Sequence, residues 1–434
     1  MTSSPVISLV GAGGKSSTLF QLARAMVEGH WPVVFLTATS HLGAWQTSEA
    51  NRHFVVSDKE TLSELLEKDL QGSILITGEI IEDRASPIDE VTLGWLHKKA
   101  LTEKIPLLIE ADGSHGLPLK APAEHEPPIP EFTDHVIVVA GVSALGKPLN
   151  DEHVHRAEIF AHLSGLKLNE NITPASIIKT LSHPSGGLKN IPPLARRTVF
   201  LNQADTAELQ SICGRMAGEL LDHYDSVTVG SVQQKTFLST EHIAGIILAA
   251  GQGIRFGSPK QLLDWKGKPF VRHTAETALH AGLRPVVVVT GFHAPEVEAA
   301  LRGLPVNIIF NPDFQNGQST SVRKGLEGLP RNIGASMFLL ADQPQIPSEV
   351  IRALIDYHGR ELPRILAPLV HEERRANPVL FDKVTFLDLM QLSGDVGGRA
   401  IFDKHHVDYL PWHDDTLLLD VDKPEDYQRL MELE

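Results

Sequence analysis

The sequence twice places a short apolar run directly before a glycine-rich loop. Residues 6–10, VISLV, enter GAGGKSS, and residues 245–249, GIILA, enter AGQGIRFGSPK. Both runs are too short for helices and suit strands that are buried in a parallel sheet. Because glycine permits positive φ angles, the backbone N–H groups of each loop can turn towards an anion. Two such loops, far apart in the chain, predict two α/β domains.

Chain length and composition agree with two folded domains. At 434 residues the chain is too long for one ordinary core, and 42% hydrophobic with 21% charged residues is typical of a soluble globular protein. A formal charge of −15 argues against a nucleic acid or an anionic membrane as partner. Positive charge at a binding site must therefore be local.

Cysteine content and the N-terminus indicate a compartment. The single cysteine, Cys213, excludes internal disulfides and a zinc site built from several cysteines, and it suits a reducing environment. The N-terminus has no basic leader and only five apolar residues before the first glycine, too few for a secretion signal or a membrane span. We expect a cytoplasmic protein.

The second loop carries the residues of a phosphate site. Gly251, Gly253 and Gly257 free the backbone, and Arg255 and Lys260 add positive charge. The loop is not a Walker loop, which needs Ser or Thr after Gly-Lys, nor a dinucleotide fingerprint, whose third glycine comes one residue earlier. The alternative is a surface turn with two solvated cations.

Acidic residues follow later apolar runs of the second half. Asp342 follows 337–341, and Asp422 follows 417–421, with Asp420 as the alternative acid there. We expect both runs to be strands, and carboxylates at neighbouring strand ends can hold Mg²⁺ together with phosphate oxygens and water. The alternative for either aspartate is a strand cap.

A loop that enters a helix is expected over residues 311–322. Gly317 would make the turn, and Ser319 and Ser321 would stand near the first helical residues. Serine at this position can cap the helix or donate to a phosphate.

From about residue 243 to 434 the chain resembles the molybdenum cofactor nucleotidyltransferases, and most of all the cytidylyltransferases. The motifs that carry the resemblance are LAAGQGIRFGSPKQLL, NPDFQNGQSTSV, LLADQP, ANPVLF, SGDVGGRAIF and DVDKPEDY. The resemblance implies a nucleotidyltransferase fold of the GT-A/Rossmann-like type, with a mixed sheet. It also implies transfer of CMP from CTP to Mo-molybdopterin with release of pyrophosphate and Mg²⁺ as cofactor. The related guanylyltransferases usually have glycine where this chain has Ala250, which favours CTP without settling it.

Motif chemistry and resemblance together give the expected site of the second domain. The expected catalytic residues are Arg255, Lys260 and Asp342, and the expected metal ligands are Asp342 and Asp422. The expected nucleotide-binding residues are Leu248, Ala249, Ala250, Gly251, Gly253, Lys260, Gly317, Ser319 and Ser321. By resemblance alone, Asn377 and Asp395 lie on the acceptor side.

The first loop, GAGGKSS, is the short G-x-x-G-K-S form that Mur-type ligases use, and a helical pattern follows it. Gly11, Gly13 and Gly14 free the backbone, Lys15 can reach terminal phosphates, and Ser16 can ligate Mg²⁺. A nucleotide site is expected, with a purely structural glycine turn as the alternative.

Further apolar runs predict a parallel, doubly wound sheet around this loop. They are residues 33–37, 74–78, 107–111, 135–140, 198–202 and 226–230. Glu110 and Asp112 end the third of these runs, either as an acid pair that holds Mg²⁺ or as strand-end acids that face solvent. FLNQAD at 200–205 resembles the N-[KQ]-x-D guanine-reading motif of GTPases, in which Asp205 would accept two hydrogen bonds from guanine.

The irregular segment 111–130 has four polar residues, His115, Lys120, His125 and Glu126, which we interpret as hydrogen-bonding groups more readily than as a metal site. Together the motifs VGAGGKSS, LIEADGSHGLPLKAPAEHEPPIP and VAGVSALGKPLNDEHVHR resemble the selenium-dependent hydroxylase accessory family, over roughly residues 5–235. The resemblance implies a molybdenum hydroxylase context and makes such an apoenzyme a candidate partner. We place a linker at 231–242, and hence domains at 1–235 and 243–434.

In the second half, the expected strands are 285–291, 306–310, 337–341, 365–370 and 417–421. Two other functions stay open for it. One is a sugar-1-phosphate nucleotidyltransferase, and the other is a protein that binds a nucleotide or finished cofactor without turnover.

Overall fold

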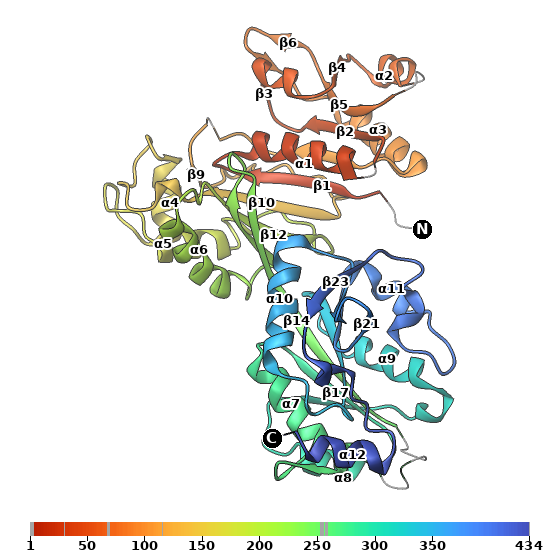
Figure 1. Cartoon of the computed structure of the whole chain (residues 1–434). Helices are drawn as coiled ribbons and strands as arrows, with labels where there is room; N and C mark the ends of the chain where they lie inside the picture. Colours follow the sequence, from red (N-terminus) through yellow and green to blue (C-terminus); the bar gives the residue numbers. More distant parts are fainter. Residues whose placement is uncertain are drawn as a thin grey trace. The chain divides into compact units, whose positions relative to one another are not determined.

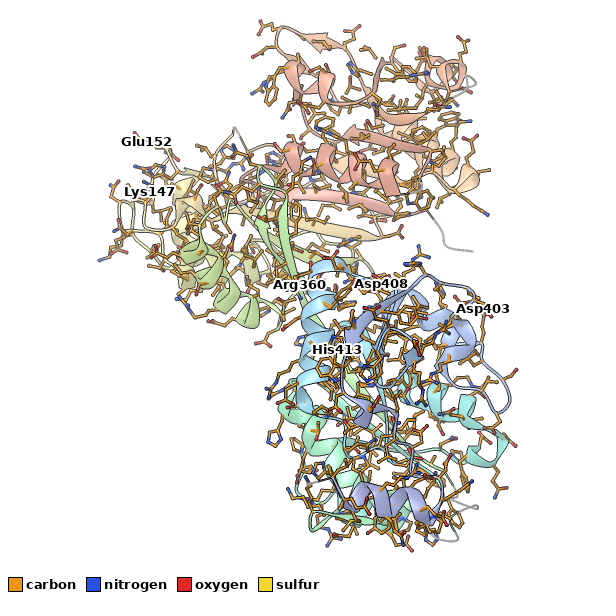
Figure 2. The ribbon with its side chains drawn as sticks, viewed as in Figure 1. Lys147, Glu152, Arg360, Asp403, Asp408 and His413 are labelled. Atoms are coloured by element: carbon orange, nitrogen blue, oxygen red, sulfur yellow. The ribbon has the colours of Figure 1, made fainter. Side chains whose placement is uncertain are left out.

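A computed structural model describes residues 4–29, 31–66, 70–114, 116–251, 256 and 259–433. The chain divides into two compact units, Met1–Thr240 and Glu241–Glu434. Each unit is described by itself. Exposed charged side chains of both signs lie on the surface of each, among them Lys147, Glu152, Arg360 and Asp403 (Figure 2).

The first unit contains a parallel sheet in the order β4-β5-β2-β8-β1-β10-β12-β13 (Figure 1). All of these neighbouring strands pair in parallel. The strands are β1 (Val6–Gly11), β2 (Val33–Ala38), β4 (Arg52–Val55), β5 (Gly72–Thr77), β8 (Leu107–Glu110), β10 (His135–Gly141), β12 (Arg196–Asn202) and β13 (Ser226–Ser231).

Helices cover both faces of this sheet. Alternate residues of β1 point to opposite faces, so Ile7 and Leu9 pack with α1 (Lys15–Gly29) while Val6 and Val10 belong to the larger core cluster on the other side. The remaining helices are α2 (Lys59–Leu65), α3 (Glu90–Glu103), α4 (Ala157–Ser164), α5 (Pro174–Ser182) and α6 (Ala207–Leu220), and all contribute to the larger cluster. The predicted doubly wound, three-layer fold is confirmed.

The predicted linker is largely strand. Only residues 232–235 separate β13 from the long strand β14 (Thr236–Ala249), whose first part pairs with β13. The hydroxyl groups of Thr228 and Ser239 lie 2.9 Å apart across this pair. The polar composition of 231–242 reflects exposed strand side chains and not an irregular segment, although the boundary between the two units lies within it.

The second unit contains a mixed sheet in the order β18-β17-β14-β19-β22-β20-β23. The pairs from β18 to β19 are parallel, β22 is antiparallel to both β19 and β20, and β23 is parallel to β20. The strands are β17 (Val286–Thr290), β18 (Asn307–Phe310), β19 (Ile333–Leu340), β20 (Ile365–Val370), β22 (Val379–Asp382) and β23 (Val407–Trp412). The mixed sheet agrees with the expected nucleotidyltransferase fold.

Helices again cover two faces. Ile247 of β14 packs in a cluster with α7 (Phe270–His280), α8 (Ala294–Ala300) and α10 (Ser348–Glu361), whereas Ile246 packs in a cluster with α9 (Gln318–Glu327) and α11 (Phe386–Met390). The last helix is α12 (Pro424–Met431). Within the described residues no helix is long and apolar enough to cross a membrane.

The strand expected at 417–421 is absent from this described segment. Residues Asp415–Leu418 form a short 3₁₀ helix, whose first turn is capped by the Asp414 carboxylate accepting from the Thr416 N–H, 2.9 Å apart. Leu417 and Val421 are buried four residues apart in different clusters, so the apolar run anchors a turn. The edge strand lies earlier in the chain, in β23.

Candidate active site

A cleft of about 660 Å³ lies at the carboxyl ends of β14 and β19 in the second unit. These strands are parallel neighbours with Leu248 opposite Leu340, so the segments that follow them meet at one edge of the sheet. The cleft residues that the sequence analysis named are Leu248, Ala249, Ala250, Gly251, Lys260, Gly317, Ser321, Asp342 and Asp395. The structure thus brings together the start of the glycine loop, the helix α9 and the aspartate after β19.

A lysine lies between two carboxylates at this cleft. The ammonium of Lys260 is 3.1 Å from Oδ2 of Asp342 and 2.6 Å from Oδ1 of Asp422. Burial alone would lower the pKa of Lys260, but the two carboxylates outweigh this effect and raise its pKa above the ordinary value. Lys260 therefore stays a cation, and it ties Asp422 to a residue 162 positions earlier.

The alternative acid, Asp420, has different partners. The side-chain amide of Gln343 donates to Asp420, and Asn377 donates in turn to the Gln343 oxygen at 3.1 Å. Burial, reinforced by the nearby charges of Asp342 and Asp422, raises the pKa of Asp420. Asp422 and not Asp420 is the acid that contacts Lys260.

The turn before α9 requires glycine. Gly317 has φ +103°, and a Cβ there would come within 2.5 Å of the Gly394 backbone. Asp395 accepts from the Gln318 N–H at 3.1 Å, so the segment 394–395 closes over the start of α9. The site therefore combines segments about 75 residues apart in the chain.

The two predicted serines of α9 differ in their surroundings. The Ser319 hydroxyl is fully buried and donates to the Gly394 carbonyl at 2.7 Å, so it supports the turn and does not line the cleft. Ser321 lines the cleft, and its oxygen accepts from the Asn311 side chain at 3.0 Å. Its hydroxyl hydrogen can still be donated to a ligand.

Asp342 and Asp422 supply donors that suit a divalent cation. Both carboxylates already converge on one positive charge, and Mg²⁺ prefers a few carboxylate oxygens completed by water and phosphate. No group of three or more His, Cys, Asp or Glu suited to a metal occurs in the described part of the chain. A metal ion bound between these two carboxylates would therefore need further ligand atoms from its substrate. Mg²⁺ accepts phosphate oxygens as such ligands. The predicted residues Gly253, Arg255 and Gly257 lie outside the described residues.

The loop of the first unit has the backbone of an anion site. Gly11, Gly13 and Gly14 all have positive φ, at +97°, +77° and +109°. A Cβ on Gly13 would lie 2.3 Å from the Gly141 nitrogen, so glycine is required there. The loop leads into α1, whose first residue is Lys15. Ser16, the predicted Mg²⁺ ligand, follows Lys15 in the first turn.

The acids beside this loop are buried, so the solvent-facing alternative is wrong. Glu110 and Asp112 are only 5% and 3% exposed. The Lys15 ammonium donates to the Gly11 carbonyl at 2.8 Å and lies 3.2 Å from Asp112 and 4.0 Å from Glu110. Burial raises the pKa of Glu110, opposed in part by Lys15 and the Ser16 hydroxyl. Among the described residues, none donates a hydrogen bond to Oε2 of Glu110.

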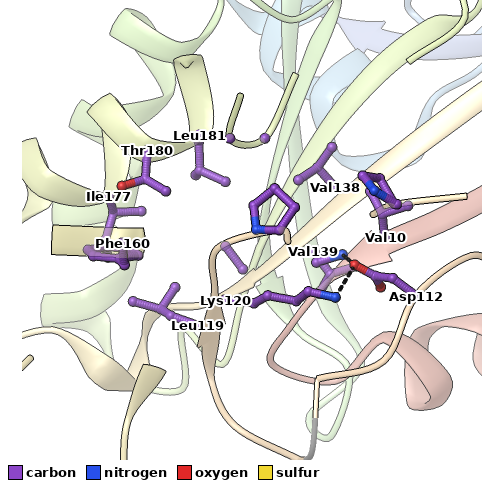
Figure 3. A pocket seen from close by; sticks show the side chains of 16 residues that line it. Val10, Asp112, Leu119, Lys120, Val138, Val139, Phe160, Ile177, Thr180 and Leu181 are labelled. Carbon is purple, nitrogen blue, oxygen red and sulfur yellow. Dashed lines mark hydrogen bonds and ion pairs between the residues drawn. The ribbon is translucent and has the colours of Figure 1, made fainter. Parts of the chain in front are cut away.

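Two polar residues of segment 111–130 support the loop. Lys120 contacts Asp112 and Glu126, each at 2.9 Å, beside a small cavity of about 40 Å³ (Figure 3). Arg156 binds Glu126 through two hydrogen bonds of 2.6 and 3.0 Å. Burial acts to raise the pKa of Glu126, but these cations outweigh it and hold it at about 2. Of the histidines of this segment, His125 is exposed and His115 lies outside the described residues.

Sequence reasoning missed Arg156 and the contact of Asn202 with the glycine loop of the first unit. The Asn202 side chain donates to the Gly13 carbonyl at 2.7 Å. Asn202 was marked in the sequence only by its position in FLNQAD, and Arg156 only as the last residue of the motif VAGVSALGKPLNDEHVHR, without a role of its own.

Both units match known families. A family model described as YqeC protein matches residues 7–158, and one described as MobA-like NTP transferase domain matches residues 245–409. The uncharacterized protein YqeC of Escherichia coli (strain K12) is 33% identical over 233 residues, which cover 53% of this chain and 88% of that protein.

The second unit has relatives of its own. Nicotine blue oxidoreductase of Paenarthrobacter nicotinovorans is 30% identical over 204 residues, which cover 44% of this chain and 96% of that protein. The crystal structure of Rv0371c in complex with manganese, from Mycobacterium tuberculosis H37Rv, is 27% identical and has a TM-score of 0.40, covering 44% of this chain and 100% of that one.

Proposed function

Because the chain belongs to the YqeC protein family in its first half and to the MobA-like NTP transferases in its second, we propose that the second unit is a molybdenum cofactor cytidylyltransferase. An oxygen of the terminal phosphate of Mo-molybdopterin forms a bond to the α-phosphorus of CTP. The bond from that phosphorus to the bridging oxygen breaks, and pyrophosphate leaves with the electron pair. No covalent enzyme intermediate is needed.

The residues of the cleft fit this reaction. Lys260 remains cationic and can neutralise charge that develops on the leaving phosphates. The Ser321 hydroxyl lines the cleft and can donate to a phosphate oxygen. In such transfers the protein mainly positions the reactants and offsets charge, so no further nucleophile is required.

Asp342 and Asp422 are the proposed holders of Mg²⁺. When bound, the ion would supply positive charge to the triphosphate. Lys260 then needs another partner, and the phosphates themselves can take that place.

The pyrimidine preference rests on Ala250. This residue is 5% exposed and lines the cleft. Its methyl group packs against Gly291, where an added Cβ would lie 2.9 Å from the Ala250 Cβ. We infer that a methyl group in place of hydrogen at this position leaves less room beside the glycine loop, which favours a smaller base over a purine.

The observation that carries the proposal is the position of Lys260 between Asp342 and Asp422 at the nucleotide cleft. The test is incubation with Mo-molybdopterin, Mg²⁺ and each of CTP, GTP and ATP, with measurement of pyrophosphate. Release with CTP well above the other two supports the proposal. Release of pyrophosphate with GTP alone would support a nucleotidyltransferase whose substrate is GTP instead of CTP.

The similarity to nicotine blue oxidoreductase favours a redox reaction as the second candidate. Such a reaction would transfer electrons between two substrates and release no pyrophosphate. The two candidates are separated by following the absorbance of nicotine blue and the release of pyrophosphate in parallel. The paired acids around Lys260 support the transferase, since electron transfer needs no such cluster.

For the first unit we propose a nucleoside phosphate site at Gly11, Gly13, Gly14, Lys15 and Ser16. Its support is the positive φ of the three glycines together with a buried lysine and two buried carboxylates, each with one oxygen that accepts no hydrogen bond from the described residues. A molybdenum hydroxylase apoenzyme is the proposed recipient of the finished cofactor. Co-purification of the two proteins, dependent on CTP, would test that partner.

A further inference from the structure

The turn after β12 is held directly beside the phosphate loop of the first unit. The strands β1, β10 and β12 are consecutive parallel neighbours, so their carboxyl ends share one edge of the sheet. Asn202, the last residue of β12, pairs with Gly141 of β10. Gly141 in turn lies against Gly13 of the phosphate loop.

Asn202 connects three segments. It is 4% exposed, its amide nitrogen donates to the Gly13 carbonyl at 2.7 Å, and its amide oxygen accepts from the Val232 N–H at 3.0 Å. Gln203, which adopts φ +65°, accepts from the Ser143 hydroxyl at 2.5 Å. The turn thus has a fixed position relative to the loop glycines.

Asp205 ends this turn with an available carboxylate. Its backbone is held, because Gln234 donates to the Asp205 carbonyl at 3.2 Å and the Ala204 N–H donates to Gly230 at 3.0 Å. The side chain is exposed, and among the described residues none donates to it. Capping of α6 does not use it, since the Thr206 hydroxyl accepts from the Leu209 N–H.

We infer that the nucleotide of the first unit carries guanine, and that Asp205 reads the base. Guanine presents two adjacent donors, its ring N1–H and its 2-amino group, and a carboxylate offers two acceptor oxygens in matching positions. Adenine presents an acceptor at N1, which a carboxylate repels. Asp205 is three residues from Asn202, at most roughly 10 Å along the chain. One bound nucleotide can therefore place its phosphates at the glycine loop and its base at Asp205.

This inference rests on the proposed phosphate site, and its test separates the two. Binding of GDP and ADP to the full chain is measured by calorimetry with Mg²⁺, beside the Lys15→Ala chain. The binding that Lys15→Ala removes is assigned to the first unit. We expect GDP to bind there roughly 10- to 100-fold more tightly than ADP, the range for a lost charge-assisted pair of hydrogen bonds.

A base exchange tests Asp205 itself. Xanthine has a carbonyl in place of the 2-amino group of guanine, and an asparagine amide can donate to that carbonyl. The Asp205→Asn chain should therefore bind GDP more weakly by a similar factor and bind xanthosine diphosphate more tightly than the wild type does. Asp222→Asn, at another exposed aspartate of the unit, is the control and should change neither affinity. A folding defect would lower both affinities and could not produce the gain.

The outcomes differ for the two ideas. Equal binding of GDP and ADP, or an Asp205→Asn chain with unchanged preference, overturns guanine recognition and leaves the phosphate site in place. Absence of any binding that depends on Lys15 overturns the phosphate site itself.

Discussion

At the scale of single residues, Lys260 connects the glycine loop to both proposed metal ligands. Its side chain is 15% exposed, and its ammonium contacts Asp342 and Asp422, which come from different segments. We predict that Lys260→Ala slows pyrophosphate release about 100-fold, comparable to loss of one preorganised charge donor. The control is Lys266→Ala, an exposed lysine over the Trp265 ring, which should leave the rate unchanged. Equal rates in both variants would remove Lys260 from the mechanism.

Asp342 permits a test that separates charge from shape. Asp342→Asn keeps the volume of the side chain but removes the negative charge that a hard cation needs. We predict that the variant stays folded, loses Mg²⁺-dependent turnover and binds Mg²⁺ more weakly in calorimetry. Asp403→Asn, at an exposed aspartate of the same unit, serves as control. Normal metal titration by Asp342→Asn would reduce Asp342 to a structural role.

Glu126 predicts a dependence of stability on pH. Its pKa in the folded state, about 2, lies below its ordinary value of 4.5, so its contribution is present above pH 4.5 and is lost as the pH falls towards 2. Glu126→Gln should lower the Tm at pH 7, and the difference from the wild type should shrink at pH 3. Glu103→Gln, which breaks an exposed pair with Lys99, should show little difference at either pH. A Tm difference for Glu126→Gln that is constant with pH would contradict the assignment.

Residue chemistry was predictable where a motif fixed it. The sequence indicated Lys260 and Asp342, because a glycine loop and an acid after a buried strand have clear chemical roles. Asp422 was indicated by the resemblance, and the strand expected before it is absent from the described residues 417–421. The sequence left Asp420 as an alternative, since only the folded chain shows which acid meets Lys260. Ser319 was assigned to the ligand, but its burial against Gly394 arises from a segment far along the chain.

At the scale of elements, Gly317 controls how α9 begins. We predict that Gly317→Ala lowers both stability and activity, because the new Cβ meets the Gly394 carbonyl at 2.5 Å in addition to the strain of φ +103°. Gly282→Ala is a matched control, since Gly282 has φ +96° but open space around its Cβ position. The difference between the Tm values of the Gly317→Ala and Gly282→Ala chains measures the effect of the contact between the new Cβ and Gly394. Similar losses in both would leave backbone strain as the whole effect.

Buried strands were more predictable than edge strands. β2, β5, β8 and β17 are apolar runs because helices cover both faces of the sheet. The edge strands β4 and β23 are only partly buried, so their sequences, RHFV and VDYLPW, lack such a run. In 417–421 the apolar residues serve a turn, which local composition does not distinguish from a strand.

At the scale of the whole molecule, the second unit has the components of an independent domain. We predict that residues 241–434 fold and transfer CMP alone. Every pair that β14 makes with β17 and β19 lies within residues 242–249, and all three core clusters of the unit consist of residues beyond 242.

A second fragment gives this last prediction its control. Residues 250–434 lack β14, which lies between β17 and β19 in the sheet, and should fail to fold. Circular dichroism, thermal melting and pyrophosphate release are compared for both fragments and the full chain. A cooperative melt and full-chain turnover by 241–434 are expected, because the cleft residues all belong to this unit. If 241–434 melts cooperatively but is inactive while the full chain works, then the first unit contributes to catalysis, and the cleft residues alone are not sufficient.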